Sequence, residues 1–179
     1  MESLALMLRA VNVGRRRVPM PALRELLGDA GFEDVQTYVQ SGNVVLRSQD
    51  PAPAVAERCR ALISERFGFD VPVVSRTEAE LAAVLEHDPF AAIATDPKRY
   101  WVSFLDSELP QEAHERLEAL TRGEEKFEVR GREIYGWFPD FTARSKLATA
   151  LAAPAKNLVA TARNWTTVGV LHTMTQNGS

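Results

Sequence analysis

A hairpin in residues 35–47 constrains the fold of this chain more than any other stretch of its sequence. Two β-rich runs, residues 35–39 and 44–47, flank the polar segment formed by Gln40, Ser41, Gly42 and Asn43. Serine, glycine and asparagine tolerate turn conformations at low cost, and the β-branched residues on both sides favour strands. The pattern therefore predicts two antiparallel strands joined by a tight turn.

Strand and helix patterns alternate around this hairpin. Residues 4–11 are apolar on both faces, as in a central strand, and residues 71–75 form another β-rich run. One helix is predicted to begin at Pro19 or Pro21, and a second to end at Gly68. The first 75 residues thus have the order β-α-β-β-α-β, which is typical of a ferredoxin-like (α/β plait) sheet with two helices on one face.

The same order is predicted again in the second half. Thr77 begins a linking helix, with Glu80 in the position of a capping box. A terminal helix is expected from about Trp165, capped by Thr166 or Asn164. Between them the predicted elements are strand 100–105, a helix after Pro110, a hairpin around Gly131, helix 144–153 and strand 156–161. The predicted fold class is α+β, with two tandem ferredoxin-like domains at 1–76 and 100–179, joined by residues 77–99.

Composition limits the classes of protein to consider. The chain has 179 residues, 45% hydrophobic and 25% charged, which suits a globular protein. No apolar run approaches the roughly 20 residues of a membrane-spanning helix, so we expect no membrane association. The lone Cys59 fits a reducing cytoplasm. The net charge of −3 argues against a dedicated duplex-DNA binder.

Positive charge is nevertheless clustered in two places. The first is the run Arg15, Arg16 and Arg17. The second is the segment after Asp140, which contains cations but no carboxylate; these cations are Arg144, Lys146, Lys156 and Arg163. Such clusters are most often solvated surface, but they are also the best candidates for binding an anion.

Four ordered motifs resemble a bacterial family known as domain of unknown function 1697. The family pattern has an R-x-x-N-V-G loop, a V-x-M-x-x-L helix start, a Y-x-Q-S-G-N hairpin and a T-x-R-N-W segment. The matching residues are Arg9, Asn12, Val13 and Gly14; Val18, Met20 and Leu23; Tyr38, Gln40, Ser41, Gly42 and Asn43; and Thr161, Arg163, Asn164 and Trp165. The resemblance implies two ferredoxin-like domains and no particular activity. The run Arg15–Arg17 departs from the family, whose loop usually carries glycine, lysine or other polar residues there.

Each candidate site residue has a structural and a functional interpretation. Ser41 and Asn43 are ordinary turn residues, whereas a turn does not require Gln40. Arg9 is expected either in an ion pair or in a pocket with Asn12 and Gln40. Two further segments, one with Arg144 and Lys146 and one with Arg163 and Asn164, are predicted at helix starts, where free N–H groups attract anions or are simply capped.

Signals for other chemistry are weak. The aromatic residues of the second domain faintly resemble those of an RNA-recognition motif, but we expect them to pack in the core; they are Trp101, Phe104, Tyr135 and Trp137. No metal-ligand spacing, phosphate-loop motif or catalytic triad is present, and Cys59 lies in a helical stripe typical of a core position. We therefore expect no cofactor, and the sequence leaves open whether the protein is an enzyme.

Three classes of function follow from these observations. The first is a binding module for a phosphorylated small molecule or single-stranded nucleic acid. Its site residues would be Arg9, Asn12, Gly14, Arg15, Arg16, Arg17, Gln40, Ser41, Asn43, Arg144, Lys146, Arg163 and Asn164. The alternatives are a protein-interaction module, with a homodimer as one form, and an enzyme acting on a small polar substrate in a cleft between the domains.

Overall fold

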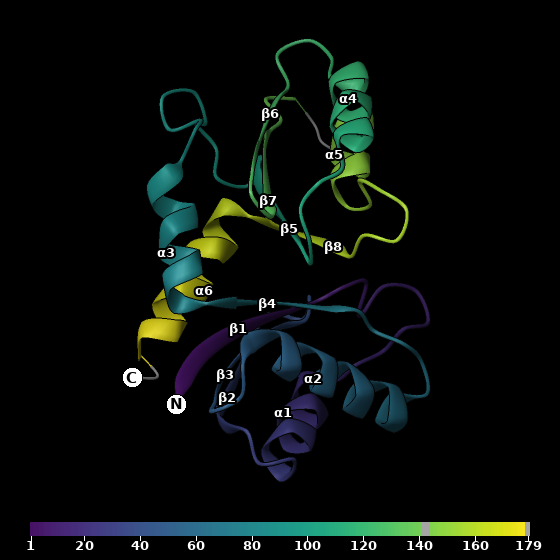
Figure 1. The fold of residues 1–179 in the computed structure, drawn as a ribbon, viewed down its shortest axis with the longest axis vertical. Helices are drawn as coiled ribbons and strands as arrows, with labels where there is room; N and C mark the ends of the chain where they lie inside the picture. The colour runs from purple at the N-terminus through teal and green to yellow at the C-terminus, as the bar shows by residue number, and fades with distance from the viewer. Residues whose placement is uncertain (141–143, 178–179) are drawn as a thin grey trace. The chain divides into compact units, whose positions relative to one another are not determined.

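A computed structural model describes residues 1–140 and 144–177, and these residues form two four-stranded antiparallel sheets and six α-helices. The chain divides into two compact units (Figure 1). The N-terminal unit comprises Met1–Ala83 with Val170–Ser179, and the C-terminal unit comprises Val84–Gly169. No helix within the described residues has both the length and the hydrophobicity needed to cross a membrane.

The N-terminal unit contains the predicted β-α-β-β-α-β order. Its elements are β1 (Glu2–Leu8), α1 (Met20–Asp29), β2 (Glu33–Tyr38), β3 (Asn43–Ser48), α2 (Ala52–Phe67) and β4 (Val73–Thr77). The strand order is β2-β3-β1-β4, so β1 is central, as predicted. Strand β1 ends at Leu8 and not at Val11, because the left-handed conformation of Ala10 (φ 53°) takes the chain out of the sheet.

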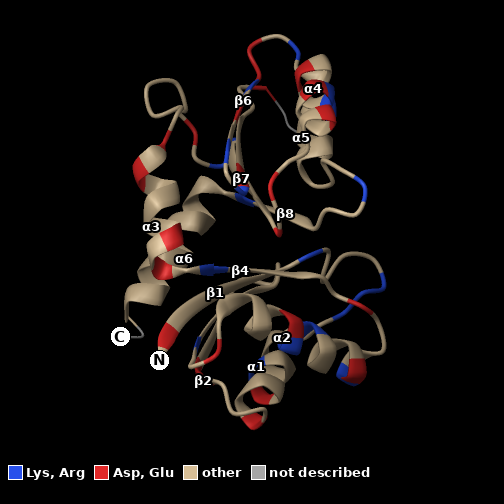
Figure 2. Ribbon diagram, in the orientation of Figure 1, with Lys and Arg blue, Asp and Glu red and all other residues tan. Residues whose placement is uncertain are grey.

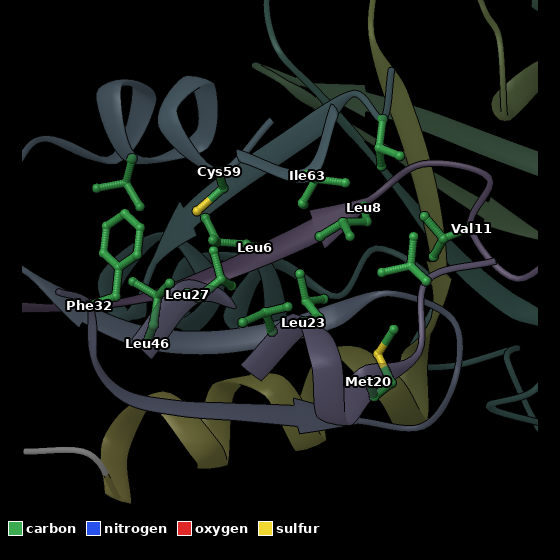
Figure 3. Close-up of a cluster of buried hydrophobic side chains, with 14 of the residues drawn as sticks. Leu6, Leu8, Val11, Met20, Leu23, Leu27, Phe32, Leu46, Cys59 and Ile63 are labelled. Atoms are coloured by element: carbon green, nitrogen blue, oxygen red, sulfur yellow. The ribbon is translucent and has the colours of Figure 1, made fainter. Parts of the chain in front are cut away.

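One hydrophobic core joins both helices of this unit to one face of its sheet. Alternate residues of β1, such as Leu6 and Leu8, face the apolar stripes of α1 and α2 (Figure 3). Cys59 is fully buried in this core, and burial raises the pKa of its thiol to about 12. Because the thiolate is the reactive form, Cys59 is a core residue and not a nucleophile, as the sequence indicated.

The C-terminal unit repeats the same element order. Its elements are β5 (Tyr100–Leu105), α4 (Gln111–Leu120), β6 (Lys126–Arg130), β7 (Glu133–Trp137), α5 (Lys146–Leu151) and β8 (Ala160–Asn164). The strand order β6-β7-β5-β8 corresponds position by position to that of the N-terminal unit. Its core packs Leu117 of α4 and Leu147 and Leu151 of α5 against β5 and β7.

Two predictions about the C-terminal unit were wrong in their boundaries. The last strand is Ala160–Asn164 and not residues 156–161, so Thr161 and Arg163 lie within a strand and not at a helix start. Asn157 has a φ of 66°, which keeps the preceding segment out of extended structure. Helix α5 is also shorter than residues 144–153, because Ser145 is its N-cap and leaves Arg144 outside.

Helices α3 (Glu78–His87) and α6 (Trp165–Asn177) each follow directly after the fourth strand of a unit. Thr77 and Glu80 form the predicted capping box: Glu80 N–H donates to Thr77 Oγ1 at 3.2 Å, and Thr77 N–H donates to Glu80 Oε2 at 2.8 Å. At the start of α6, Thr167 N–H donates to Asn164 Oδ1 at 2.9 Å. Asn164, and not Thr166, is therefore the N-cap of α6.

Candidate functional site

In the N-terminal unit, the loop after β1 meets the turn between β2 and β3. Asn12 joins them, because its Nδ2 donates to Gln40 O at 2.7 Å and to Val18 O at 3.0 Å. Val18 N–H donates to Asn12 Oδ1 at 3.0 Å. We call this assembly, residues 9–18 and 39–43, the N-terminal joint. The Asn12 side chain is therefore committed to holding the joint together and is not available to a ligand.

Gly42 allows the closest approach in the joint. Leu8 N–H donates to Gly42 O at 2.8 Å, and Gly42 has a φ of 78°. A Cβ atom on Gly42 would lie 2.5 Å from Val11 Cγ2 and 2.7 Å from Leu8 Cβ. Only glycine fits this position, both for its backbone conformation and for its contacts.

Asn43 is a structural residue of the turn. It is fully buried, and its Nδ2 donates to Tyr38 O at 3.1 Å and to Ser41 Oγ at 3.0 Å. Gln40 differs, because its side chain is exposed and has no hydrogen-bond partner among the described residues. Of the three amide side chains in the joint, Asn12, Gln40 and Asn43, only Gln40 is without a hydrogen bond to a described residue, so it is available to a ligand.

The backbone of the joint is strained. Ala10, Asn12 and Gly14 have positive φ values of 53°, 56° and 59°. Val11 and Val13, which lie between them, have ordinary negative φ values. Val39 has a φ of 51°, a conformation that β-branched residues rarely adopt. Strain of this kind is often found at functional sites, where the surrounding structure holds it in place.

The alternation of φ leaves backbone amides unused. Asn12 N–H donates to Arg16 O at 2.7 Å, and Arg16 N–H donates to Val13 O at 3.2 Å, which closes the loop on itself. Val13 and Arg16 form an isolated antiparallel bridge. The N–H groups of Ala10 and Gly14 have no acceptor within the described part of the chain, and both residues are exposed. The joint therefore offers these two backbone donors to solvent or to a ligand.

The arginines of the joint are of two kinds. Arg9 is half-buried and Arg15 and Arg17 are exposed, and none has an ion pair or side-chain hydrogen bond to a described residue. Arg16 instead lies over the Phe69 ring at 5.6 Å from its centroid. Figure 2 shows Lys and Arg along the loop between β1 and α1. Arg9 thus lacks the ion pair that was one of its two expected roles, at least among the described residues. The other expected role, a place in a ligand pocket, stays a prediction.

The remaining predicted site residues belong to the C-terminal unit. Arg144 and Lys146 are exposed on either side of Ser145. Arg163 is buried, and its Nη1 donates to Thr161 Oγ1 at 2.7 Å and to Ala162 O at 2.8 Å. Burial lowers the pKa of Arg163 to about 10. Arg163 therefore bonds to its own strand, which favours a structural role over an exposed anion contact.

The aromatic residues of this unit lie in its interior. Phe104, Tyr135 and Trp137 are buried, and Tyr135 Oη donates to Val84 O at 3.3 Å. Burial, and then the nearby Glu133 carboxylate, raises the pKa of Tyr135 above its usual value. These rings pack as core residues, as the sequence indicated, and do not form the stacking surface of an RNA-recognition motif.

Comparisons with known proteins place the chain in a family. A family model described as "protein of unknown function (DUF1697)" matches residues 1–135. The chain belongs to this family. No curated protein sequence matches it. A solved structure of a conserved bacterial protein from Streptococcus pneumoniae is similar, with a TM-score of 0.79 and 24% identity over 98% of this chain and 99% of the other. That similarity supports a common fold.

Three of the four DUF1697-like motifs meet in the N-terminal joint. The loop motif contributes Asn12, the helix-start motif contributes Val18 and the hairpin motif contributes Gln40 and Gly42. The fourth motif, on β8 and α6, lies outside the matched residues 1–135. The contacts among the first three show that these motifs form one structural assembly, although they are distant in sequence.

Sequence reasoning missed one polar cluster in this DUF1697 protein. His87 Nε2 donates to Glu128 Oε1, Arg130 donates to His87 Nδ1, and the ring of His87 lies edge-on to Tyr135 at 5.2 Å between centroids. No local signal could have revealed it, because His87 is separated from these charged partners by 41 and 43 residues. Within the described residues no group of His, Cys, Asp or Glu side chains is arranged to hold a metal ion.

Proposed function

We propose that the N-terminal joint binds the phosphate group of an organic ligand, either a phosphorylated small molecule or a single-stranded nucleic acid. One observation carries this proposal: the unused amides of Ala10 and Gly14 lie on the same short loop as Arg15 and Arg17, which have no ion pair with a described residue. Backbone segments whose φ alternates in sign can form concave "nests" of N–H groups, which are anion sites in other proteins.

Both kinds of donor suit a phosphate. Backbone N–H groups fix its position, and guanidinium groups add charge-assisted hydrogen bonds, which are stronger than neutral ones. The loop does not need to order itself on binding, because Asn12 already fixes it through three hydrogen bonds. Preorganisation of this kind lowers the entropic cost of binding.

Apolar groups beside these donors favour an organic ligand over free phosphate. Val13 and Val39 are 67% and 52% exposed, and both belong to the joint. The free amide of Gln40 lies in the same turn as Val39 and can both donate and accept hydrogen bonds. A ligand with a phosphate and a less polar part would use all of these groups.

A thermal-shift panel at low salt tests the proposal. Nucleotides, sugar phosphates, inorganic phosphate and short single-stranded RNA and DNA would be compared on the intact chain. A ligand at about 100 times its Kd stabilises the fold by roughly 2.7 kcal/mol, so binding raises the Tm. We expect Arg15→Ala/Arg17→Ala to abolish the shift and Arg24→Ala/Arg66→Ala, which removes the same charge elsewhere on the unit, to retain it. A flat panel on well-folded protein contradicts the proposal and favours association with a partner or a second copy.

We propose further that each unit is a ferredoxin-like domain and that the protein works in the cytoplasm. The strand orders β2-β3-β1-β4 and β6-β7-β5-β8, with two helices against each sheet, support the first statement. The single buried Cys59 supports the second, because structural disulfides are rare in a reducing compartment.

A further inference from the structure

The C-terminal unit has a hollow beside α4 and α5 that belongs to no site described above. Its volume is about 430 Å³. Three cations line it: Arg116 from α4, Lys146 from the first position of α5 and Arg144, which precedes the N-cap Ser145; Leu120, Thr149 and Ala150 also line it. We call it the α4–α5 hollow.

Arg116 is held in place at this hollow. Its Nη2 donates to Ala153 O at 3.2 Å and to Pro154 O at 2.9 Å, just beyond the end of α5. Its Nη1 and Nε groups have no partner within the described residues. One nitrogen of the guanidinium group is thus fixed, and the other donors are free to bind a ligand. Because the side chain is already ordered, binding costs little side-chain entropy.

The charged side chains that line this hollow are all cations. No described carboxylate lines the α4–α5 hollow. Glu112 lines a neighbouring hollow together with Arg116 and Lys156, and Glu118 lines another with Lys126. Neither Arg144 nor Lys146 has an ion pair with a described residue. The chain contains no Asp or Glu after Asp140, so the segment that supplies Arg144 and Lys146 brings no neutralising charge.

From this arrangement we infer that the α4–α5 hollow is a second anion-binding site and that it takes a phosphate-bearing ligand. Three cations in a hollow that no described carboxylate lines suit a group with more than one negative charge, such as a phosphate dianion or a diphosphate. The phosphate can belong to a small molecule or to the backbone of a single-stranded nucleic acid. The inference does not depend on the N-terminal joint, because none of its residues is shared.

Nuclear magnetic resonance on the full-length protein tests this inference site by site. The Arg116 Nε–H signal and the backbone amides of residues 144–150 would be followed at low salt during titration with pyrophosphate and, separately, with a short single-stranded RNA. We expect saturable shifts of these signals with at least one probe. Saturation by pyrophosphate identifies a small-molecule phosphate site, and saturation by RNA alone identifies a backbone site.

Matched variants complete the test. Arg144→Ala/Lys146→Ala should weaken the apparent Kd by about tenfold or more, as expected for loss of charge-assisted contacts. Lys98→Ala/Arg122→Ala removes the same charge from exposed positions of the unit and should change it less than about twofold. Lys146→Glu introduces a carboxylate at a helix N-terminus, where the dipole tolerates it, and should abolish the shifts in a folded protein. Absence of saturable shifts with both probes, or equal affinity in the Arg144→Ala/Lys146→Ala variant, would overturn the inference.

Discussion

The side-chain nitrogen of Asn12 lies 2.7 Å from the carbonyl oxygen of Gln40, a residue 28 positions further along the chain. This contact ties the loop after the central strand β1 to the turn that precedes β3, its neighbour in the sheet. The loop is thereby held in a strained conformation in which the amides of Ala10 and Gly14 have no acceptor among the described residues. The structural role of Asn12 and the proposed binding role of the loop are therefore two aspects of one arrangement.

Replacing Asn12 with alanine should destabilise the protein. Asn12→Ala removes three hydrogen bonds, two of them to the N–H and C=O groups of Val18. It also places alanine at a φ of 56°. We expect a loss of about 2 kcal/mol in the free energy of unfolding, measured by urea denaturation. Gln40→Ala should cost less than about 0.5 kcal/mol, because Asn12 uses only the backbone carbonyl of Gln40. Equal losses in the two variants would contradict this assignment.

Two glycines of the joint should respond differently to alanine. Gly42→Ala combines a positive φ with contacts of 2.5 Å and 2.7 Å to Val11 and Leu8, so we expect a loss of about 3 kcal/mol or failure to fold. In Gly14→Ala the added Cβ atom has no other atom within 4 Å, so only the φ of 59° is unfavourable. We expect a loss of about 1 kcal/mol in the free energy of unfolding. Unfolding free energies of similar size for the two variants would show that packing against β1 is not what requires Gly42.

The order of elements was predictable because its signals are local. The hairpin at Gln40–Asn43, the strand at Tyr100–Leu105 and the capping box of Thr77 and Glu80 each depend on neighbouring residues. The boundaries of β8 were not predictable from apolar residues, because its pairing with β5 brings polar positions such as Arg163 into the sheet. Long-range pairing decided that boundary.

The caps of α6 offer a third test. Asn164→Ala should cost about 1 kcal/mol of stability, because Asn164 Oδ1 accepts the Thr167 N–H at 2.9 Å. Thr166→Ala, at an exposed position next to it, should change stability by less than about 0.5 kcal/mol. Chemical denaturation of both variants measures the difference, and a reversed order would contradict the assigned cap.

Cys59 should make stability depend on pH in the alkaline range. Burial raises the pKa of its thiol from the usual 9.0 to about 12. Between these values the unfolded thiol loses its proton while the folded thiol keeps it, so the unfolded state binds fewer protons and stability falls as pH rises. Below pH 9 this contribution is fully present.

The Cys59→Ala variant isolates this effect, since Tyr100 and Tyr135, whose pKa values are also raised, contribute equally to both proteins. It is expected to be less stable overall, because a cavity replaces the thiol, but its stability should fall less between pH 9 and 10. The difference in slope should be about 1 kcal/mol per pH unit, measured by urea denaturation at pH 8, 9 and 10. Parallel curves for the two proteins would show that the thiol ionises equally in both states.

Only part of the candidate site could be predicted from the sequence. The arginine run and Gln40 were identifiable by residue type, and Asn43 was correctly weighed as a turn residue. The left-handed conformations of Ala10 and Val39 could not be predicted, because neither residue type favours a positive φ. Tertiary contacts of the joint impose these conformations. Arg116 was not identified as a site residue, because its role depends on contacts with the segment just after α5, which the local sequence does not reveal.

The most direct test of anion binding at the N-terminal joint is the response of its own amides. Proton–nitrogen spectra of the full-length protein, recorded at low salt during titration with the phosphorylated ligand that gives the largest thermal shift, would follow the amides of Ala10 and Gly14. Anion binding predicts saturable downfield proton shifts of these amides, and their loss in Arg15→Ala/Arg17→Ala. Unchanged signals at saturating ligand, or shifts of equal size in that variant, would contradict binding at the joint.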